Sequence, residues 1–118
     1  MDLPPCPASP NCVSTEASDS RHGIAPFFLL RDDAWPEIRG AVLALSRTKV
    51  VEQSENSMRA ECRSAFAGFV DDLTVALRVE QGTLAVRSAA RTGDYDFGVN
   101  RRRIEQLRAA LQARGIVR

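Results

Sequence analysis

The sequence predicts an α+β protein: a two-layer sandwich in which two helices cover one face of a four-stranded antiparallel meander, in the order α-β-β-β-β-α. Two observations carry this prediction. Between residues 49 and 90 apolar and polar residues alternate with a period of two, and on both sides of that block they recur with helical spacing. The chain has 118 residues, 44% of them hydrophobic, which is enough for one domain with a buried core.

The first helix is predicted from about residue 33 to residue 46. Apolar residues recur at spacings of three and four between Ala34 and Leu45. Pro36 falls in the first turn, where its missing N–H leaves no hydrogen bond unmade. The Asp32-Asp33 pair precedes the apolar stripe, so we expect one of these side chains to cap the helix.

Four strands are predicted between residues 49 and 90. The alternation is strongest over residues 73–79, and Gln81-Gly82 has the composition of a compact hairpin turn. We expect Phe69, just before this strand, to pack in the core. The sheet face that the helices cover is predicted to carry Leu73, Val75, Leu77, Val79, Leu84 and Val86.

The last helix is predicted from about residue 100 to Gly115. Its apolar stripe includes Ile104, Leu107 and Leu111. We expect Asn100 to be the N-cap, and Val99 to pack on Ile104 as a hydrophobic staple.

Residues 1–26 are predicted to be an irregular arm rich in proline and serine, laid over a single α+β domain of residues 27–118. Helical or strand periodicity is absent from this arm. The apolar run at residues 27–30 is either a short strand or a plug in the core.

The arm holds two of the three cysteines, and three interpretations are open. Cys6 and Cys12 could form a disulfide, could bind zinc together with His22, or could be free thiols. Cys12 with His22 would be a weak nucleophile pair because both lie on a flexible arm. A lone histidine also more often satisfies a local hydrogen bond than acts in catalysis. Cys62, on the apolar side of its strand, is predicted to be a core thiol.

Charge and hydropathy narrow the class of protein. The formal net charge of +1 argues against nucleic-acid binding, although residues 84–118 hold eight arginines against Asp94, Asp96 and Glu105. No apolar run approaches the roughly 20 residues that span a bilayer, and the N-terminus lacks a secretory signal. The sequence shows no cofactor loop and no paired metal motif. It leaves the cellular compartment and the oligomeric state open.

The turn between the last strand and the last helix, residues 87–101, is the predicted ligand site. Helix N-termini present free N–H groups that favour anions. Alternatively, Asp94 and Asp96 neutralise the arginines, and Gly93 and Gly98 only permit positive φ angles. The predicted contacts are Arg87, Ser88, Arg91, Asp96, Asn100 and Arg101.

Asp71 and Asp72 are the candidate catalytic carboxylates. Adjacent strand residues point to opposite faces, so the two cannot form a dyad by themselves. Either one acts as a general base beside an arginine, or one caps the turn and the other forms an ion pair. The candidate arginines for that ion pair are Arg63, Arg87 and Arg91.

Three motifs in this order resemble the family catalogued as domain of unknown function 1499. They are residues 6–14 (CPASPNCVS), residues 68–72 (GFVDD), and the pattern between Arg87 and Glu105. The resemblance spans nearly the whole chain and implies a small bacterial or plastid domain of the periplasm or cell envelope. It implies no activity. Unlike the family pattern, Ala90 replaces a common serine and the strand at residues 57–64 lacks an aromatic residue and a histidine.

These observations favour a non-enzymatic protein that binds a small anionic ligand, a headgroup or a protein partner at residues 87–101. One alternative is a structural envelope or interaction module in which all the motif charges are paired. The other is a small hydrolase or isomerase that uses Asp71 or Asp72 with Arg87 or Arg91. A binding module predicts unpaired arginines, a structural module predicts paired charges, and an enzyme predicts a pocket carboxylate with no arginine partner.

Overall fold

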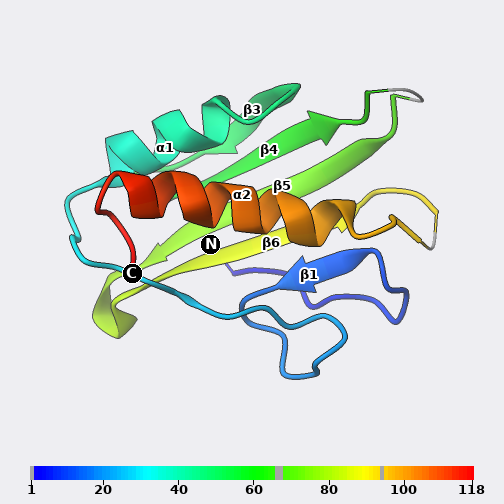
Figure 1. Ribbon diagram of the computed structural model, residues 1–118, viewed down its shortest axis with the longest axis horizontal. Helices are drawn as coiled ribbons and strands as arrows, with labels where there is room; N and C mark the ends of the chain where they lie inside the picture. The colour runs from blue at the N-terminus through cyan, green and yellow to red at the C-terminus, as the bar shows by residue number, and fades with distance from the viewer. Residues whose placement is uncertain (1, 66–67, 94) are drawn as a thin grey trace.

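The computed structural model describes residues 2–65, 68–93 and 95–118. Figure 1 shows both helices side by side over one face of an antiparallel sheet, which confirms the α+β class. In chain order the elements are β1 (Cys12–Ser14), β2 (Phe27–Phe28), α1 (Trp35–Leu43), β3 (Thr48–Gln53), β4 (Ser57–Arg63), β5 (Val70–Arg78), the short 3₁₀ helix η1 (Val79–Gln81), β6 (Thr83–Ala90) and α2 (Val99–Ala113).

The sheet has six strands rather than the predicted four. Strands β3 to β6 form the expected meander, but β1 and β2 both pair antiparallel with the outer edge of β6. The predicted arm of residues 1–26 is therefore not irregular throughout, because it contains β1, and the run at residues 27–30 begins with a short strand, one of its two predicted alternatives. β1 and β2 have only three and two residues, too few for a period-two pattern to be recognised. Their conformation comes from hydrogen bonding to the open edge of β6.

The core lies between the sheet and the helices. Leu73, Val75, Leu84 and Val86 are at most 1% exposed, as the alternation predicted. Val79 is 53% exposed, because η1 turns the chain after β5 and takes this residue off the sheet face. The helices contribute the other side of the core with Ile38, Val42, Ile104, Leu107 and Leu111.

Both helices begin differently from the prediction. Ala34 is the N-cap of α1 and no side chain caps that end, while Asp33 lies 3.3 Å from Arg31 in an ion pair. Gly98 is the N-cap of α2, with φ +78°, a left-handed conformation that glycine adopts without a Cβ clash. Val99 is thus the first helical residue and, being 38% exposed, is not half of a staple.

The N-terminal arm is cross-linked within itself at two points. Cys6 and Cys12 form a disulfide, which leaves neither sulfur as a thiolate for zinc or for nucleophilic attack. The buried His22 ring contacts Asp19 Oδ2 through Nδ1 at 2.7 Å and the Ser9 carbonyl through Nε2 at 2.9 Å. Cys62 is the core thiol that was expected, and burial raises its pKa.

In the described part of the chain, no helix has the length and apolar character needed to cross a bilayer.

The disulfide closes a short loop, with a sequence separation of 6, and such a cross-link stabilises a fold by about 2 kcal/mol through the unfolded chain. We expect the Cys6→Ser/Cys12→Ser variant to unfold at lower urea, with a free energy of unfolding lower by about that amount. Dithiothreitol should lower the stability of the natural chain and leave the variant unchanged. Equal stability of the two proteins without reductant would contradict the prediction.

Candidate functional site

Two loops meet at one end of the sheet. One connects β4 to β5 and the other, residues 91–98, connects β6 to α2 (Figure 1). They enclose a pocket of about 470 Å³ with Ser64, Asp71, Thr92, Gly93 and Asp96 among its lining residues. The remaining lining residues are apolar or aromatic: Phe69, Ala90, Tyr95, Phe97 and Val99.

Asp96 caps α2 in place of the predicted Asn100. Its Oδ1 accepts a hydrogen bond from the Gly98 N–H at 2.9 Å, and its Oδ2 accepts from the Asn100 N–H at 3.0 Å and the Asn100 Nδ2 at 2.7 Å. Burial alone would raise the pKa of Asp96, but these hydrogen bonds outweigh it and hold the pKa below its ordinary value. The carboxylate therefore serves the helix N-terminus and stays ionised.

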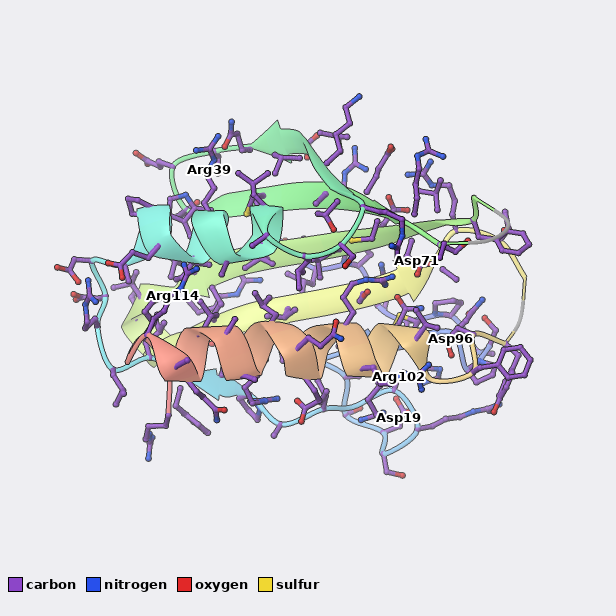
Figure 2. All side chains as sticks on the ribbon, turned by 45° about the horizontal axis from the view of Figure 1, so that its top comes forward. Asp19, Arg39, Asp71, Asp96, Arg102 and Arg114 are labelled. Carbon is purple, nitrogen blue, oxygen red and sulfur yellow. A yellow bond between two sulfur atoms is a disulfide. The ribbon has the colours of Figure 1, made fainter. Side chains whose placement is uncertain are left out.

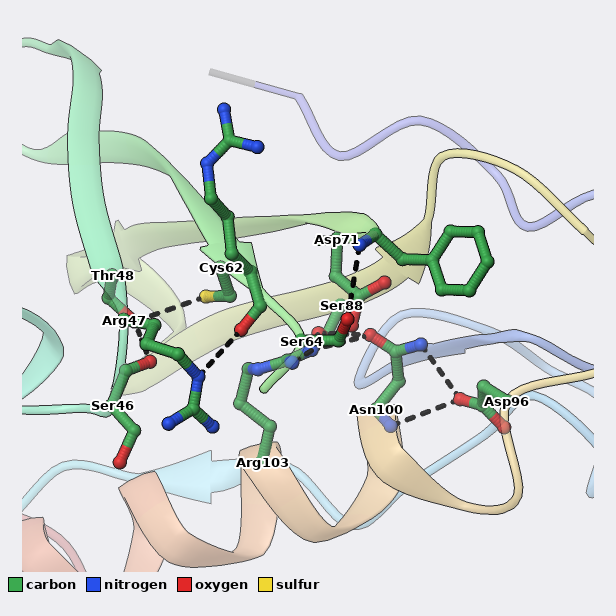
Figure 3. Close-up of polar contacts among 12 residues, drawn as sticks. Ser46, Arg47, Thr48, Cys62, Ser64, Asp71, Ser88, Asp96, Asn100 and Arg103 are labelled. Atoms are coloured by element: carbon green, nitrogen blue, oxygen red, sulfur yellow. Dashed lines mark hydrogen bonds and ion pairs between the residues drawn. The ribbon is translucent and has the colours of Figure 1, made fainter. Parts of the chain in front are cut away.

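Beneath the first turn of α2 lies a buried polar network (Figure 3). Ser88 and Asn100 are fully buried, and Ser88 Oγ donates to Asn100 Oδ1 at 2.6 Å. Arg103 Nη1 donates to Ser88 Oγ at 3.0 Å and to Asn100 Oδ1 at 2.8 Å. Its Nη2 lies 2.8 Å from Asp71 Oδ2, and both side chains are nearly buried. The network joins β5, β6 and α2.

Asn11 extends this network into the N-terminal arm. Its Nδ2 donates to the Gly93 carbonyl at 2.6 Å, while its own carbonyl accepts from the Ala90 N–H at 2.9 Å and from Asn100 Nδ2 at 3.3 Å. Asn11 was not among the predicted site residues. The available signal was its place inside the motif of residues 6–14, directly before Cys12.

Asp72 lies on the opposite sheet face, away from Asp71. Arg91 Nη2 is 2.6 Å from Asp72 Oδ1 and 2.9 Å from Glu61 Oε2, and Arg59 lies 3.4 Å from the same Asp72 oxygen. The hydrogen bonds to Asp72 and then Glu61 raise the pKa of Arg91. Arg91, one of the three candidate arginines, thus forms the ion pair with Asp72 that was the alternative to a catalytic role. Arg103, the partner of Asp71, was not among those candidates.

The predicted arginine contacts do not converge. Arg87 shares the sheet face of Arg91, donates to the Pro5 carbonyl at 3.4 Å, and has a buried Nε that no described residue accepts from. Burial lowers the pKa of Arg87. Arg101 instead holds the arm by donating to the Gly23 carbonyl at 3.0 Å and the Arg21 carbonyl at 3.3 Å. Asp94, weighed as a neutralising partner, lies outside the described residues.

The rim of the pocket is aromatic and open to solvent. Phe69, which was expected in the core, is 59% exposed, and Tyr95 and Phe97 are 65% and 77% exposed. The Tyr95 and Phe97 rings meet edge to face with centroids 4.9 Å apart. The core prediction for Phe69 was wrong because apolarity alone does not show whether a loop residue faces inward.

The cavity next to this pocket is lined by Arg63 and Arg103 and by two further arginines, Arg47 and Arg102. Arg102 Nη1 donates to the Phe97 carbonyl at 2.9 Å, and Figure 2 shows this residue near Asp96 at the N-terminal end of α2. Arg47 donates through Nε to the Arg63 carbonyl at 3.0 Å. Both line this adjoining cavity of about 190 Å³, which shares Val99 with the apolar pocket. Within the described residues neither guanidinium has a carboxylate partner.

A family model covers this whole arrangement, matching residues 2–111 of the chain. The chain belongs to the family described as Protein of unknown function (DUF1499). The matched range includes the arm with Asn11, both loops and most of α2. Among curated proteins no match was found.

The candidate bases of this DUF1499 protein are already engaged in ion pairs or hydrogen bonds. Asp71 forms an ion pair with Arg103 and Asp72 forms one with Arg91, so each candidate base is already engaged by a cation. Asp96 lines the pocket without an arginine partner but accepts three hydrogen bonds from the helix end. Within the described residues, no group of histidine, cysteine and acidic side chains could hold a metal ion.

The Asp71–Arg103 pair should be costly to break from one side. We expect Arg103→Met to lower the free energy of unfolding by about 3 kcal/mol, because it leaves the nearly buried Asp71 carboxylate without its cation. The double variant Asp71→Asn/Arg103→Met should recover part of that loss. A double-mutant cycle tests this, with the free energies of unfolding in urea measured for the natural chain, Asp71→Asn, Arg103→Met and the double variant. Strictly additive effects would show that the two side chains are not coupled.

Asp96 should make the protein sensitive to acid. Because its pKa is lower in the folded state than in the unfolded chain, the stability it contributes is fully present above about pH 4 and is lost as the pH falls through the lowered pKa. We expect the unfolding free energy of Asp96→Asn to fall less steeply with acidification below pH 4. Asp32→Asn, an exposed carboxylate before α1, is the control. Parallel pH profiles for the natural chain and Asp96→Asn would contradict this assignment.

Proposed function

We propose that this DUF1499 protein is a non-enzymatic binding module that holds a small anionic ligand or headgroup at the β6–α2 turn. The supporting observation is a pair of guanidinium groups, Arg102 in the first turns of α2 and Arg47 in the lining of the same cavity, neither of which has a carboxylate partner among the described residues. Each donates to one backbone carbonyl and keeps further N–H groups for an anion.

The proposed anion contacts, Arg47 and Arg102, lie outside the predicted contacts at residues 87–101. Arg91 is engaged by two carboxylates and Arg101 by two carbonyls, whereas Ser88, Asn100 and Asp96 serve the buried network and the cap. Arg102 lies on the exposed side of the same helix turn, so it is the stronger candidate contact.

A second candidate is the structural envelope or interaction module. It is favoured by the pairing of Asp71 with Arg103 and of Asp72 with Arg91, which accounts for most of the motif charges as parts of the fold. It leaves the positions of Arg47 and Arg102 unexplained.

Titration with methyl phosphate at constant ionic strength, followed by amide chemical shifts, tests the proposal. We expect saturable shifts around residues 91–103 and a thermal stabilisation that grows with ligand concentration, about 2.7 kcal/mol at a hundredfold excess over Kd. Arg102→Gln should weaken binding about tenfold, the loss expected from one charge-assisted hydrogen bond.

Arg114→Gln is the matched control. Arg114 also donates one N–H to a backbone carbonyl, that of Glu37, and lies at the other end of α2 (Figure 2). This variant should bind methyl phosphate like the natural chain. Equal binding by Arg102→Gln and Arg114→Gln, or stabilisation without saturable shifts, would mean general salt effects and would favour the structural module.

A further inference from the structure

We infer that the ligand is a single-chain amphiphilic anion, whose acidic group meets Arg102 and whose acyl or aromatic body enters the 470 Å³ pocket. The acidic half of this inference rests on the proposed function. The apolar half rests on the pocket itself, which is a separate observation.

The size and walls of the pocket suit an apolar body. Its volume of about 470 Å³ falls within the range of small-molecule sites, and such sites are lined mainly by aromatic and aliphatic side chains with a few polar groups. Here the rings of Phe69, Tyr95 and Phe97 supply that surface, with Ala90 and Val99. A purely polar ligand would leave this carbon surface in water.

The two carboxylates in the lining do not oppose this occupant. Asp71 is neutralised by Arg103 at 2.8 Å, and Asp96 accepts three hydrogen bonds from the first turn of α2. Both are satisfied from the protein side, so an apolar chain that displaces water from the pocket leaves neither charge without a partner.

The aromatic residues at the rim of the pocket are exposed, and one of them has an unfavourable backbone conformation. Phe97 has φ +55°, a left-handed conformation that is unfavourable for a bulky residue, and it carries the most exposed large apolar side chain of the described residues. Tyr95 packs on it and Phe69 faces the same pocket from the other loop. Exposed apolar side chains gathered around a concave site are typical of ligand or partner contact.

The acidic and apolar subsites adjoin. Val99 lines both cavities, and Arg102 follows it by three residues, which places the two on the same side of α2. A ligand with its acidic group directly joined to a chain or ring can therefore occupy both at once. A bulky headgroup between the two parts is not required.

A series of alkyl phosphates tests the inference. Methyl, butyl, hexyl and octyl phosphate are titrated calorimetrically at constant ionic strength, each as the monomer. We expect the affinity to rise about fourfold for each added CH₂, the factor expected for burial of one methylene, and then to level off when the pocket is full. Binding of every member should retain its dependence on Arg102.

Two variants separate the subsites. Phe97→Ser removes an exposed ring and should flatten the chain-length series while it leaves methyl phosphate binding unchanged. Arg102→Gln should weaken all members by the same factor. Val79→Ser removes another exposed apolar side chain, in η1 and outside the pocket lining, and should change neither the chain-length series nor methyl phosphate binding.

The outcomes distinguish the two proposals. Binding of methyl phosphate with no gain from longer chains would overturn the amphiphile and leave the anion site standing. Binding of octanol as tight as that of octyl phosphate, with no binding of methyl phosphate, would remove the anion site and overturn this inference as stated. Co-sedimentation with phosphatidylcholine vesicles that contain single-chain lysophosphatidic acid, if octyl phosphate reverses it, assigns the amphiphile to a lipid, and tight octyl phosphate binding without co-sedimentation assigns it to a free molecule.

Discussion

The structure depends on one constraint: the polar groups buried under the first turn of α2 must all find partners. Asp71 and Arg103 are both nearly buried, and a charge in that position is tolerated only beside its counter-ion. Ser88 and Asn100, both fully buried, complete the hydrogen bonds of Arg103. Because these four residues come from β5, β6 and α2, satisfying them fixes where the helix sits on the sheet.

That same network reaches the N-terminal arm through Asn11, whose side chain bonds to Gly93 and whose carbonyl bonds to Ala90 and Asn100. Cys12, which forms the disulfide with Cys6, directly follows Asn11 in the chain. The cross-link is therefore one residue away from the hydrogen bond that Asn11 donates to Gly93 in the β6–α2 turn. A segment without periodicity thus becomes an edge strand and a support for the loop that lines the pocket.

The charged residues near the pocket differ in what they contact. Some are engaged by charged groups or by the helix end: Arg103 with Asp71, Arg91 with Asp72, and Asp96 with the N-terminus of α2. Arg47 and Arg102, which line the adjoining cavity, contact only carbonyls among the described residues. Around them the aromatic rim remains open to solvent. Paired charges account for stability, and the unpaired cations beside exposed rings are the features that folding alone does not require.

Sequence patterns alone predicted the α+β class, the meander and both helices, because period-two and helical patterns are local consequences of one buried face. They did not predict β1, whose pairing depends on the free edge of β6, and they left residues 27–30, which hold β2, as either a strand or a core plug. Nor could they choose among arginines, because Asp71 of β5 meets Arg103 of α2 only once the helix is packed on the sheet. Asp96 rather than Asn100 caps α2, since the turn brings its carboxylate to the free N–H groups. The exposure of Phe69 and the pocket it lines were likewise decided by tertiary structure, because a site made of two loops exists only when both are in place.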